Sequence, residues 1–554
     1  MRARVSGAYT AAGLSPETTC ALEGRVEGIR ALAVEVGDGA DADVLAQAFT
    51  RLGDDLLTRI GGTFALLVWS DARHEGLLAT DPLGSRSVFL CETGGSLLFA
   101  TELRDLLDRL PSAAPPSEAS VARWLAYGAL DPDETLYDGI RRLPGGCCLL
   151  LRDGRWEQRR YWTPRYEGID RVGLDEAAEE VLAGVRAAVA RRCEGRRAAV
   201  LLSGGLDSGA VAATAREHAA SLRAYSAVFP GDPDADEARL IELATTTLRI
   251  PSTTQPHAAD GVLQASAEHV AEWRLPAASP NLFFQTGLLV GARDDGAEVV
   301  LDGQGGDELF GAAPFLLADR VRRGRRGEAR RLAHDLAGDD EKLAGRLYRR
   351  YGLRGASPAA LVTLRRRLRR AAPHHWLTSH ASAAARTEPG STTRLDGPRW
   401  WADEADRLTR GRERAGVHDH LRRKLAAAGL EGGHPLLDDL PLVGLVLRLP
   451  PALAFDPELD RPLLRRAVRG LLPDEIRLRP TKSYFDSLVV ESLSGPERPQ
   501  LTGLLGSPQA EIRRYVTEAR LRDIVEGPTA RERPFDWAWN SWRVASTELW
   551  LRSL

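Results

Sequence analysis

The run Ser203-Gly204-Gly205-Leu206-Asp207-Ser208 has the residue types of a turn that binds phosphate. The apolar segment Ala198–Leu202 comes before it and predicts a buried parallel strand. The Ala-rich segment Gly209–Ala219 comes after it and predicts a helix. Such a turn presents free backbone N–H groups at a helix N-terminus, where they bind phosphate. Gly204 and Gly205 would let the backbone approach an anion closely.

The acid in this run, Asp207, adds a second requirement. A carboxylate would repel a bare phosphate, so it fits the turn if a divalent cation lies between them. The run therefore predicts a Mg²⁺-nucleotide site that binds pyrophosphate. It is not a Walker A loop, because no Gly-Lys-Ser/Thr follows four variable residues. The alternative is an ordinary Gly-rich loop, and the complete run after an apolar strand favours the nucleotide site.

A second turn has the same design. The apolar segment Val299–Leu301 leads into Asp302–Gly311, which is rich in glycine and acid. Ligands of a parallel sheet bind at the carboxyl ends of its strands, so both turns would face one ligand. Asp207 and Asp307 would then give Mg²⁺ two carboxylates. The alternative is a tight turn and helix start, in which Asp307 and Glu308 favour the helix dipole.

A third segment, Leu472–Phe485, has two prolines, Pro473 and Pro480, around a short helical piece, and a lysine follows the second proline. Pro480 restrains the backbone just before Lys482. A positioned lysine can neutralise charge on a pentavalent phosphate or an oxyanion. The alternative is a solvated surface lysine, which is the usual fate of this residue. Lysine is rare in this chain and arginine is common, so a lysine at position 482 weakly favours a functional role for this residue.

In order along the chain, these motifs resemble those of the asparagine synthetase B superfamily, and the resemblance covers nearly all of the sequence. His434–Asp438 falls at a further position of that pattern. The N-terminal third is similar to the family's glutaminase domain in five segments: Gly62–Leu66, Asp81–Gly84, Phe99–Glu102, Leu143–Gly146 and Arg160–Trp162.

The resemblance implies an α/β protein of two domains. Residues 1–165 would form a glutaminase-like domain of stacked β-sheets, with strands in the apolar runs Phe64–Trp69, Gly76–Ala79 and Ser96–Ala100. Residues 175–554 would form an ATP-pyrophosphatase synthetase domain of the adenine nucleotide α-hydrolase type, with a parallel sheet. A basic helical insertion is expected at about residues 315–420.

The resemblance also implies the cofactors ATP and Mg²⁺ and a set of site residues. The adenosine would be bordered by Leu201, Val228 and Gly303. The phosphates would lie on the turn formed by Ser203, Gly204, Gly205, Leu206 and Ser208. Asp207 and Asp307 would hold Mg²⁺. A substrate carboxylate would attack the α-phosphorus to give an acyl-adenylate and pyrophosphate, an amine would then displace AMP, and Lys482 would stabilise the developing charge in both steps.

The resemblance does not identify the residue that deprotonates the amine. β-Lactam synthetases use a Tyr–Glu pair, whose tyrosine position falls on Gln304, a residue that cannot act as a base. Glu431 resembles the glutamate of the family pattern and is the candidate for the base.

One departure changes the expected function. Glutaminase domains of this family use a cysteine directly after the initiator methionine as nucleophile, whereas Arg2 stands here and the first cysteine is Cys20. The N-terminal domain is therefore expected to be a scaffold that makes no ammonia. Members without this cysteine include β-lactam and carbapenam synthetases and lasso peptide cyclases, which join an amine and a carboxylate of one substrate.

A second departure is the long segment between Gly311 and His434. Residues 320–370 hold 16 Arg and one Lys against five acids, a local charge near +12 in a chain of net charge −3. It is either a solvated helical face, a nucleic-acid patch, which lacks interleaved aromatics, or a docking surface for an acidic peptide. Pro373–Leu377 and the tryptophans after Asp536 resemble lasso peptide cyclases.

The resulting hypothesis is lasso peptide macrolactam closure, between the N-terminal amine of a precursor peptide and an Asp or Glu side chain. Expected partners are the precursor peptide, a leader-binding protein and a leader peptidase, with no nucleic acid and no membrane. The alternatives are a β-lactam/carbapenam-type or ammonia-using amide synthetase, and a non-catalytic scaffold, against which the intact Asp207, Asp307 and Lys482 argue. Five cysteines without metal spacing, no signal peptide and no long apolar run favour a cytoplasmic protein with reduced thiols.

Overall fold

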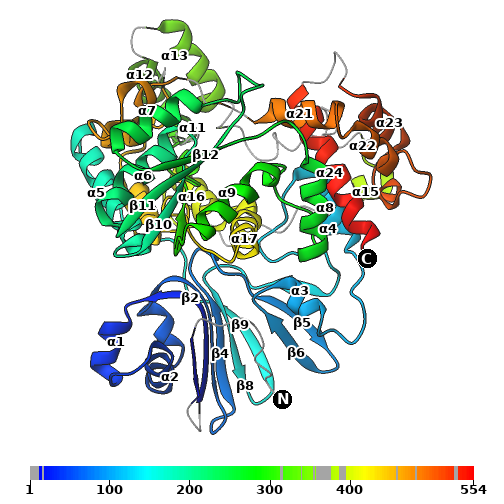
Figure 1. The fold of residues 1–554 in the computed structure, drawn as a ribbon. Coiled ribbons are helices and arrows are strands. Elements are labelled where there is room, and N and C mark those ends of the chain that lie inside the picture. The colour runs from blue at the N-terminus through cyan, green and yellow to red at the C-terminus, as the bar shows by residue number, and fades with distance from the viewer. Residues whose placement is uncertain are drawn as a thin grey trace.

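The structure is a computed structural model, and it describes residues 11–14, 18–311, 316–337, 340–353, 356, 376–385, 395–456, 459–480, 483, 485–528 and 534–554. The N-terminal β-sheets lie below a larger body of helices around a second sheet (Figure 1).

The N-terminal part contains two antiparallel sheets. The larger sheet has the strand order β1-β2-β3-β4-β8-β9, formed by β1 (Ala11–Leu14), β2 (Thr18–Glu27), β3 (Gly61–Ser70), β4 (Glu75–Thr80), β8 (Cys147–Arg152) and β9 (Arg155–Arg160). The smaller sheet has the order β6-β5-β7, formed by β5 (Phe89–Thr93), β6 (Ser96–Ala100) and β7 (Ile140–Arg142). Helices α1 (Ile29–Val36) and α2 (Asp41–Leu52) follow β2 along the chain, and α3 (Leu103–Leu107) and α4 (Glu118–Tyr127) lie between β6 and β7.

Alternation along β3 explains why these layers stack. Phe64, Leu66 and Val68 are buried in one cluster with residues of α1 and α2. Leu67 and Trp69 are buried on the other side, in a cluster with residues of the smaller sheet. Side chains of a strand alternate between its faces, so a strand that is apolar throughout requires cover on both sides. The order of layers is therefore helices, larger sheet, smaller sheet, as expected for the stacked N-terminal domain.

The second sheet is parallel throughout and has the order β12-β11-β10-β13-β14. Its strands are β10 (Arg197–Leu201), β11 (Ser221–Val228), β12 (Ser252–Pro256), β13 (Val299–Leu301) and β14 (Glu431–Gly433). One face packs against α5 (Leu174–Cys193), α6 (Leu206–His218), α18 (Leu440–Arg448) and α19 (Pro462–Ala467). The other face packs against α9 (Leu282–Asp294) and α17 (Arg412–Ala427). The predicted α/β fold class is confirmed.

Helix α17 also connects the two parts of the molecule through buried charges. Asp419 accepts a hydrogen bond from Ser87 Oγ at 2.7 Å and is paired with Arg142 at 2.6 Å. Glu102 is paired with Arg422 and Arg423, each at 2.7 Å. Because these side chains are desolvated and cross-linked, they fix how α17 sits against the N-terminal sheets.

The basic insertion forms a small helical unit at the top of the molecule in Figure 1. Its helices α11 (Leu316–Arg322), α12 (Arg326–Ala337) and α13 (Glu341–Leu347) bury their own cluster around Leu317 and Leu347. The arginine run 322–326 was expected on a helix, but it is a helix end, a turn and a helix start, because Gly324 has φ +76°. The second arginine run, 365–370, lies outside the described residues.

Strand β9 ends at Arg160 and helix α5 begins at Leu174, and the predicted boundary between the domains 1–165 and 175–554 lies in this interval. The exact domain limits remain a prediction. None of the helices in the described ranges is both long and apolar enough to span a bilayer.

Candidate active site

The first predicted turn connects β10 to α6. Gly205 is the N-cap of α6, and Gly204 has φ +71°, a value that glycine adopts without strain. The Ser208 hydroxyl accepts a hydrogen bond from the Ser203 backbone N–H at 3.2 Å and lies 3.1 Å from the Ser203 hydroxyl. The turn is therefore held by its own side chains, and it leads into the N-terminus of α6, a place where anions bind.

The second predicted turn packs directly against the first. A Cβ atom on Gly306 would lie 2.3 Å from Cγ of Asp207, and one on Gly303 would lie 2.5 Å from the backbone N of Ser208. Neither distance is possible for a real side chain, so only glycine permits this contact. The prediction that the two turns meet at the carboxyl ends of neighbouring strands agrees with this geometry.

Both turns open onto a cavity of about 400 Å³. Most of the predicted site residues line it, namely Leu201, Ser203, Gly205, Leu206, Asp207, Ser208, Gly303, Gln304 and Asp307. Gly204 and Val228 are not among the lining residues; Gly204 packs toward α7 (Ala238–Leu248), and from β11 the cavity is lined by Tyr225 and Ala227.

A buried arginine joins the two predicted metal ligands. Arg461 Nη1 lies 2.7 Å from Asp307 Oδ1 and also contacts Asp207 Oδ2. Its Nη2 lies 2.9 Å from Asp460 Oδ2. Burial alone would lower the pKa of Arg461, but Asp207 and Asp307 outweigh burial and raise the pKa. Arg461 has φ 53° and ψ 47°, a strained conformation of the kind found at functional sites.

The convergence of Asp207 and Asp307 on one nitrogen tests whether they suit Mg²⁺. Oxygens of both carboxylates face the same point, where the guanidinium of Arg461 contacts both of them. Mg²⁺ usually takes one or two carboxylates and completes its coordination with phosphate oxygens and water. The two carboxylates therefore fit a Mg²⁺-nucleotide, with the phosphate turn beside them.

A second buried pair lies at the end of β13. Asp302 Oδ1 is 2.9 Å from His434 Nδ1 and accepts a hydrogen bond from the Gln304 N–H at 3.1 Å. Burial raises the pKa of Asp302, but His434 and Lys424 favour the charged form and the net pKa is lowered. Asp302 is therefore a carboxylate that fixes the backbone of the second turn.

The third predicted segment reaches the mouth of the cavity. Lys482 itself lies outside the described residues, but Pro480 and Ser483 line the cavity. Arg479 is paired with buried Glu237 and donates to Ser483 Oγ at 2.8 Å. These contacts hold the segment before and after Lys482 against the site.

Aromatic side chains form part of the cavity wall, called here the aromatic wall. Phe284 and Phe485 are in contact, with ring centroids 5.0 Å apart. Trp539 donates from Nε1 to Asp486 Oδ1 at 2.8 Å, and both residues line the cavity. A cavity lined by both an aromatic wall and anion-binding turns suits a ligand with one flat, apolar part and one charged part.

The structure places Glu431 away from this cavity. Glu431 begins β14, where it pairs in register with Val299, the first residue of β13. Its side chain is 51% exposed and bound to Arg196 at 2.6 Å. The cavity lies beyond the other end of these parallel strands, so the expected role of Glu431 as base does not fit this structure. Gln304 does line the cavity, although its amide cannot take a proton at neutral pH.

The sequence hypothesis did not include Arg461, Lys424 or the Asp302–His434 pair. Arg461 stands before Pro462 at the start of α19, which signals a helix start but no ligand. Lys424 follows Arg422 and Arg423 on one helix, a pattern typical of a solvated face.

Comparison with known proteins agrees with this geometry. Residues 180–552 match the family model "Asparagine synthase", and residues 28–162 match "Glutamine amidotransferase domain". The chain belongs to the asparagine synthase family.

Two relatives illustrate the range of this family. A protein of Mycobacterium tuberculosis named putative asparagine synthetase (glutamine-hydrolyzing) is 30% identical over 289 residues, which cover 50% of this chain and 44% of that protein. The carboxyethyl-arginine beta-lactam-synthase of Streptomyces clavuligerus is 30% identical over 245 residues, 43% of each protein. The matched region spans less than half the length of either relative.

Proposed function

We propose that this chain is an ATP-dependent carbon–nitrogen ligase that forms an acyl-adenylate and releases AMP and pyrophosphate. The observation that carries the proposal is the contact between the two turns, which brings Asp207 and Asp307 to one cation position beside the N-terminus of α6. A nucleotide triphosphate with Mg²⁺ needs this combination of backbone N–H groups and two carboxylates.

In this proposal the pyrophosphate lies on Ser203, Gly205 and Ser208, and Asp207 and Asp307 would hold Mg²⁺, which supplies charge neutralisation to the phosphates. Arg461 contacts both carboxylates at this position, so Mg²⁺ would take over these contacts and Arg461 would be a further cation for the phosphate oxygens. The aromatic wall and Leu201 would contact the adenosine or the apolar part of the substrate.

The chemistry runs in two steps. A substrate carboxylate attacks the α-phosphorus, the bond to the pyrophosphate breaks, and an acyl-adenylate forms. A substrate amine then attacks the acyl carbon and AMP leaves. Preorganised cations stabilise the charge that develops in each step, and Lys482 is the proposed cation next to the reacting centre. A cavity that holds the amine and the carboxylate of one substrate in the reactive orientation can lower the activation barrier by up to ~7–11 kcal/mol.

For the substrate we propose a peptide whose N-terminal amine closes onto an Asp or Glu side chain, as in lasso peptides. One support is the chemistry of the cysteines: all five are buried, so an internal supply of ammonia from the N-terminal part is not expected. The C-terminal tryptophans support it less than the sequence suggested, because Trp537, Trp542 and Trp550 are core residues. The precursor peptide, a leader-binding protein and a leader peptidase are the proposed partners.

A β-lactam-type amide synthetase is the second candidate. It is favoured by the similarity to the beta-lactam-synthase of Streptomyces clavuligerus, whose matched region includes 43% of this chain. Both candidates join an amine and a carboxylate of one substrate and differ in the size of that substrate.

Mass spectrometry tests the substrate proposal. The chain would be incubated with ATP, Mg²⁺ and a set of synthetic peptides that carry a free N-terminus and one Asp or Glu at different positions. Ring closure removes one water from the peptide and requires ATP, and a peptide with an acetylated N-terminus should not react. Closure of none of these peptides, with closure of a small β-amino acid instead, would establish the second candidate.

A further inference from the structure

One lysine of helix α17, Lys424, lines the active-site cavity. Lys424 is 6% exposed and lines the cavity together with Asp302, Gly303 and Gln304. It comes from the sheet face covered by α9 and α17, whereas Arg461 comes from the opposite face, which α19 covers. The two cations therefore approach the cavity from different sides.

The carboxylate of Asp302 acts on Lys424 through its charge but does not bind its amine. Within the described part of the chain the amine makes no hydrogen bond and no ion pair, since the nearby Asp302 is engaged by His434 and by the Gln304 N–H. A buried ammonium ion without a partner is costly, and the group responds by losing its proton. Burial accordingly lowers the pKa of Lys424, with Asp302 opposing the shift.

The identity of this residue also matters. The chain has 74 basic Lys and Arg residues, of which three are lysine: Lys342, Lys424 and Lys482. An arginine cannot lose its proton in a protein, whereas a buried lysine can. A lysine at this buried position facing the cavity can therefore supply a neutral amine, which an arginine there could not.

The proposed reaction needs a group that can take a proton. When the amine attacks the acyl carbon, its nitrogen becomes positively charged and must lose a proton before AMP can leave. Glu431 lies at the other end of the strands and Gln304 cannot act as a base. We propose that Lys424 is the general base that takes this proton from the attacking amine, an inference that rests on the proposed function.

The step balances with the groups present. The new C–N bond forms, the amine proton passes to Nζ of Lys424, and the bond between the acyl carbon and the AMP oxygen breaks with its electron pair on AMP. The resulting ammonium ion of Lys424 is favoured by the negative charge of Asp302. It returns its proton to water when the products leave.

The charged groups around Lys424 set its titration. Asp302 faces it from the end of β13, and His434 is bound to Asp302. His420 lies on the same helix, and Lys424 lowers the pKa of that histidine together with burial, which is the larger cause. The described residues that α9 contributes to the cavity are Phe284, Gln285 and Leu288, which do not titrate.

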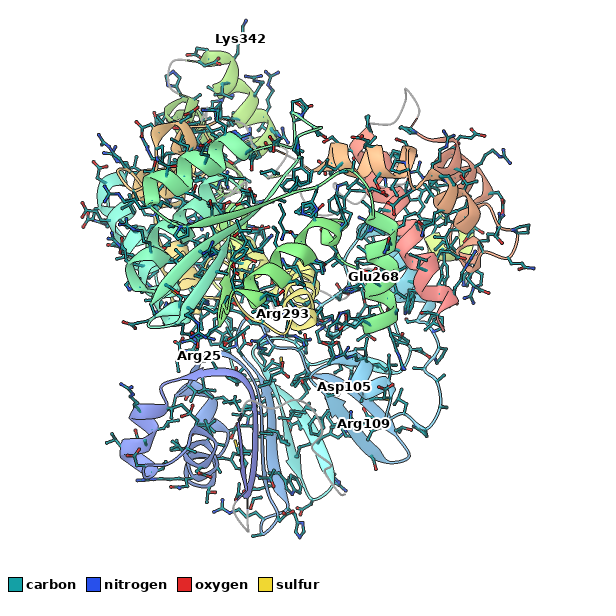
Figure 2. The ribbon with its side chains drawn as sticks, in the orientation of Figure 1. Arg25, Asp105, Arg109, Glu268, Arg293 and Lys342 are labelled. Carbon is teal, nitrogen blue, oxygen red and sulfur yellow. The ribbon has the colours of Figure 1, made fainter. Side chains whose placement is uncertain are left out.

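Measuring the two steps of the reaction separately distinguishes loss of the base from loss of adenylation. Lys424→Met and Lys424→Arg would be compared with wild type, and Lys342→Met would be the control, because Lys342 lies exposed on α13 at the edge of the molecule (Figure 2). With the synthetic Asp or Glu peptide that wild type closes, both Lys424 variants should keep ATP–pyrophosphate exchange and lose amide formation about 10²–10⁴-fold. Hydroxylamine, which is neutral at neutral pH, should still trap the acyl-adenylate in both.

Each outcome has one meaning. Loss of pyrophosphate exchange in both Lys424 variants would assign the lysine to nucleotide binding and overturn the inference. Wild-type amide formation by Lys424→Arg would also overturn it, because a guanidinium cannot take the proton. Absence of exchange in wild type would instead reject the proposed function.

A measurement without substrate tests the same inference. Isotope-labelled lysine gives one NMR signal for each of the three lysines, and the variants assign them. The Lys424 signal should titrate well below the usual range of a lysine. A Lys424 that titrates within that range would be an ammonium ion at neutral pH, and the inference would fail.

Discussion

Arg461 Nη1 lies 2.7 Å from Oδ1 of Asp307, and this nitrogen also contacts Oδ2 of Asp207. Two acids from different turns therefore share one buried positive charge at the centre of the site. The strained backbone of Arg461 is the local cost of this arrangement.

The first prediction concerns these acids. Asp207→Asn or Asp307→Asn should lower ATP turnover at least about 10²-fold, because the pyrophosphate loses a negatively charged metal ligand in a partly desolvated site. Asp294→Asn is the matched control, since Asp294 is 61% exposed and pairs with Arg293 far along α9. Turnover near that of wild type in both site variants would show that the two acids do not hold the nucleotide's metal.

Lys482 leads to the second prediction. Lys482→Ala should lower turnover about 10²–10³-fold through loss of one preorganised charge. Lys482→Arg should recover only part of this loss, because a planar fork replaces a point charge. The measurement is the rate of pyrophosphate release, with circular dichroism to show that both variants fold. A Lys482→Ala enzyme within a few-fold of wild type would assign the charge stabilisation to another cation.

The third prediction is that the chain does not hydrolyse glutamine. Cys20 is buried in β2, and burial, with Asp43, raises the pKa of its thiol to about 12. Burial likewise raises the pKa of the thiol of Cys148 to about 12. A thiol of such high pKa is a poor nucleophile. Glutamate release from glutamine would be measured against Cys20→Ser, and a rate that depends on Cys20 would contradict this account.

The buried charges between the two parts of the molecule give a prediction on stability. Burial would raise the pKa of Asp419, but Arg142, Arg423 and Arg422 hold that pKa well below its usual range. Asp419→Asn should cost about 3–5 kcal/mol, because it leaves buried guanidinium groups without their counter-charge. Asp294→Asn, on the surface, should change stability by about 1 kcal/mol or less.

The sign of the pH dependence follows from the depressed pKa. The contribution of Asp419 is complete above its unfolded-state pKa and is lost as the pH falls toward the folded-state value. Wild type should therefore lose stability in acid more steeply than Asp419→Asn, as measured by urea unfolding at several pH values. Parallel curves for the two proteins would show that Asp419 is not a stabilising carboxylate.

The fifth prediction concerns the basic insertion. Reversal of Arg322, Arg323, Arg325 and Arg326 to glutamate should weaken binding of an acidic peptide partner and leave ATP binding unchanged, since the phosphate turn is formed by other residues. Salt should weaken the wild-type complex by screening. Calorimetry at two salt concentrations checks both effects. Equal affinity for wild type and variant would identify this segment as a solvated face.

The two turns could be predicted from sequence because each is a local pattern of strand, glycine and acid. Their contact followed from a general property of parallel sheets, which brings strand ends to one edge. Arg461 and Lys424 could not be predicted in this way. Each comes from a distant helix, and Lys424 is buried because α17 packs between the parallel sheet and the N-terminal sheets through Asp419 and its partners.

Glu431 is the opposite case, a residue that was predicted for the site but lies away from it. Its place in a familiar pattern suggested a base, but parallel pairing fixes it beside Val299, at the end of the strands that is distant from the cavity. The register of a strand cannot be read from a motif alone, and it decides which side chains reach the site.

The most direct test of the central claim is the fate of ATP. Wild type would be incubated with Mg²⁺, ATP labelled in the α- or the γ-phosphate, and the peptide set described above. The account predicts labelled AMP from the first label and labelled pyrophosphate from the second, both lost in Asp207→Asn. Labelled ADP and inorganic phosphate as the products would contradict it.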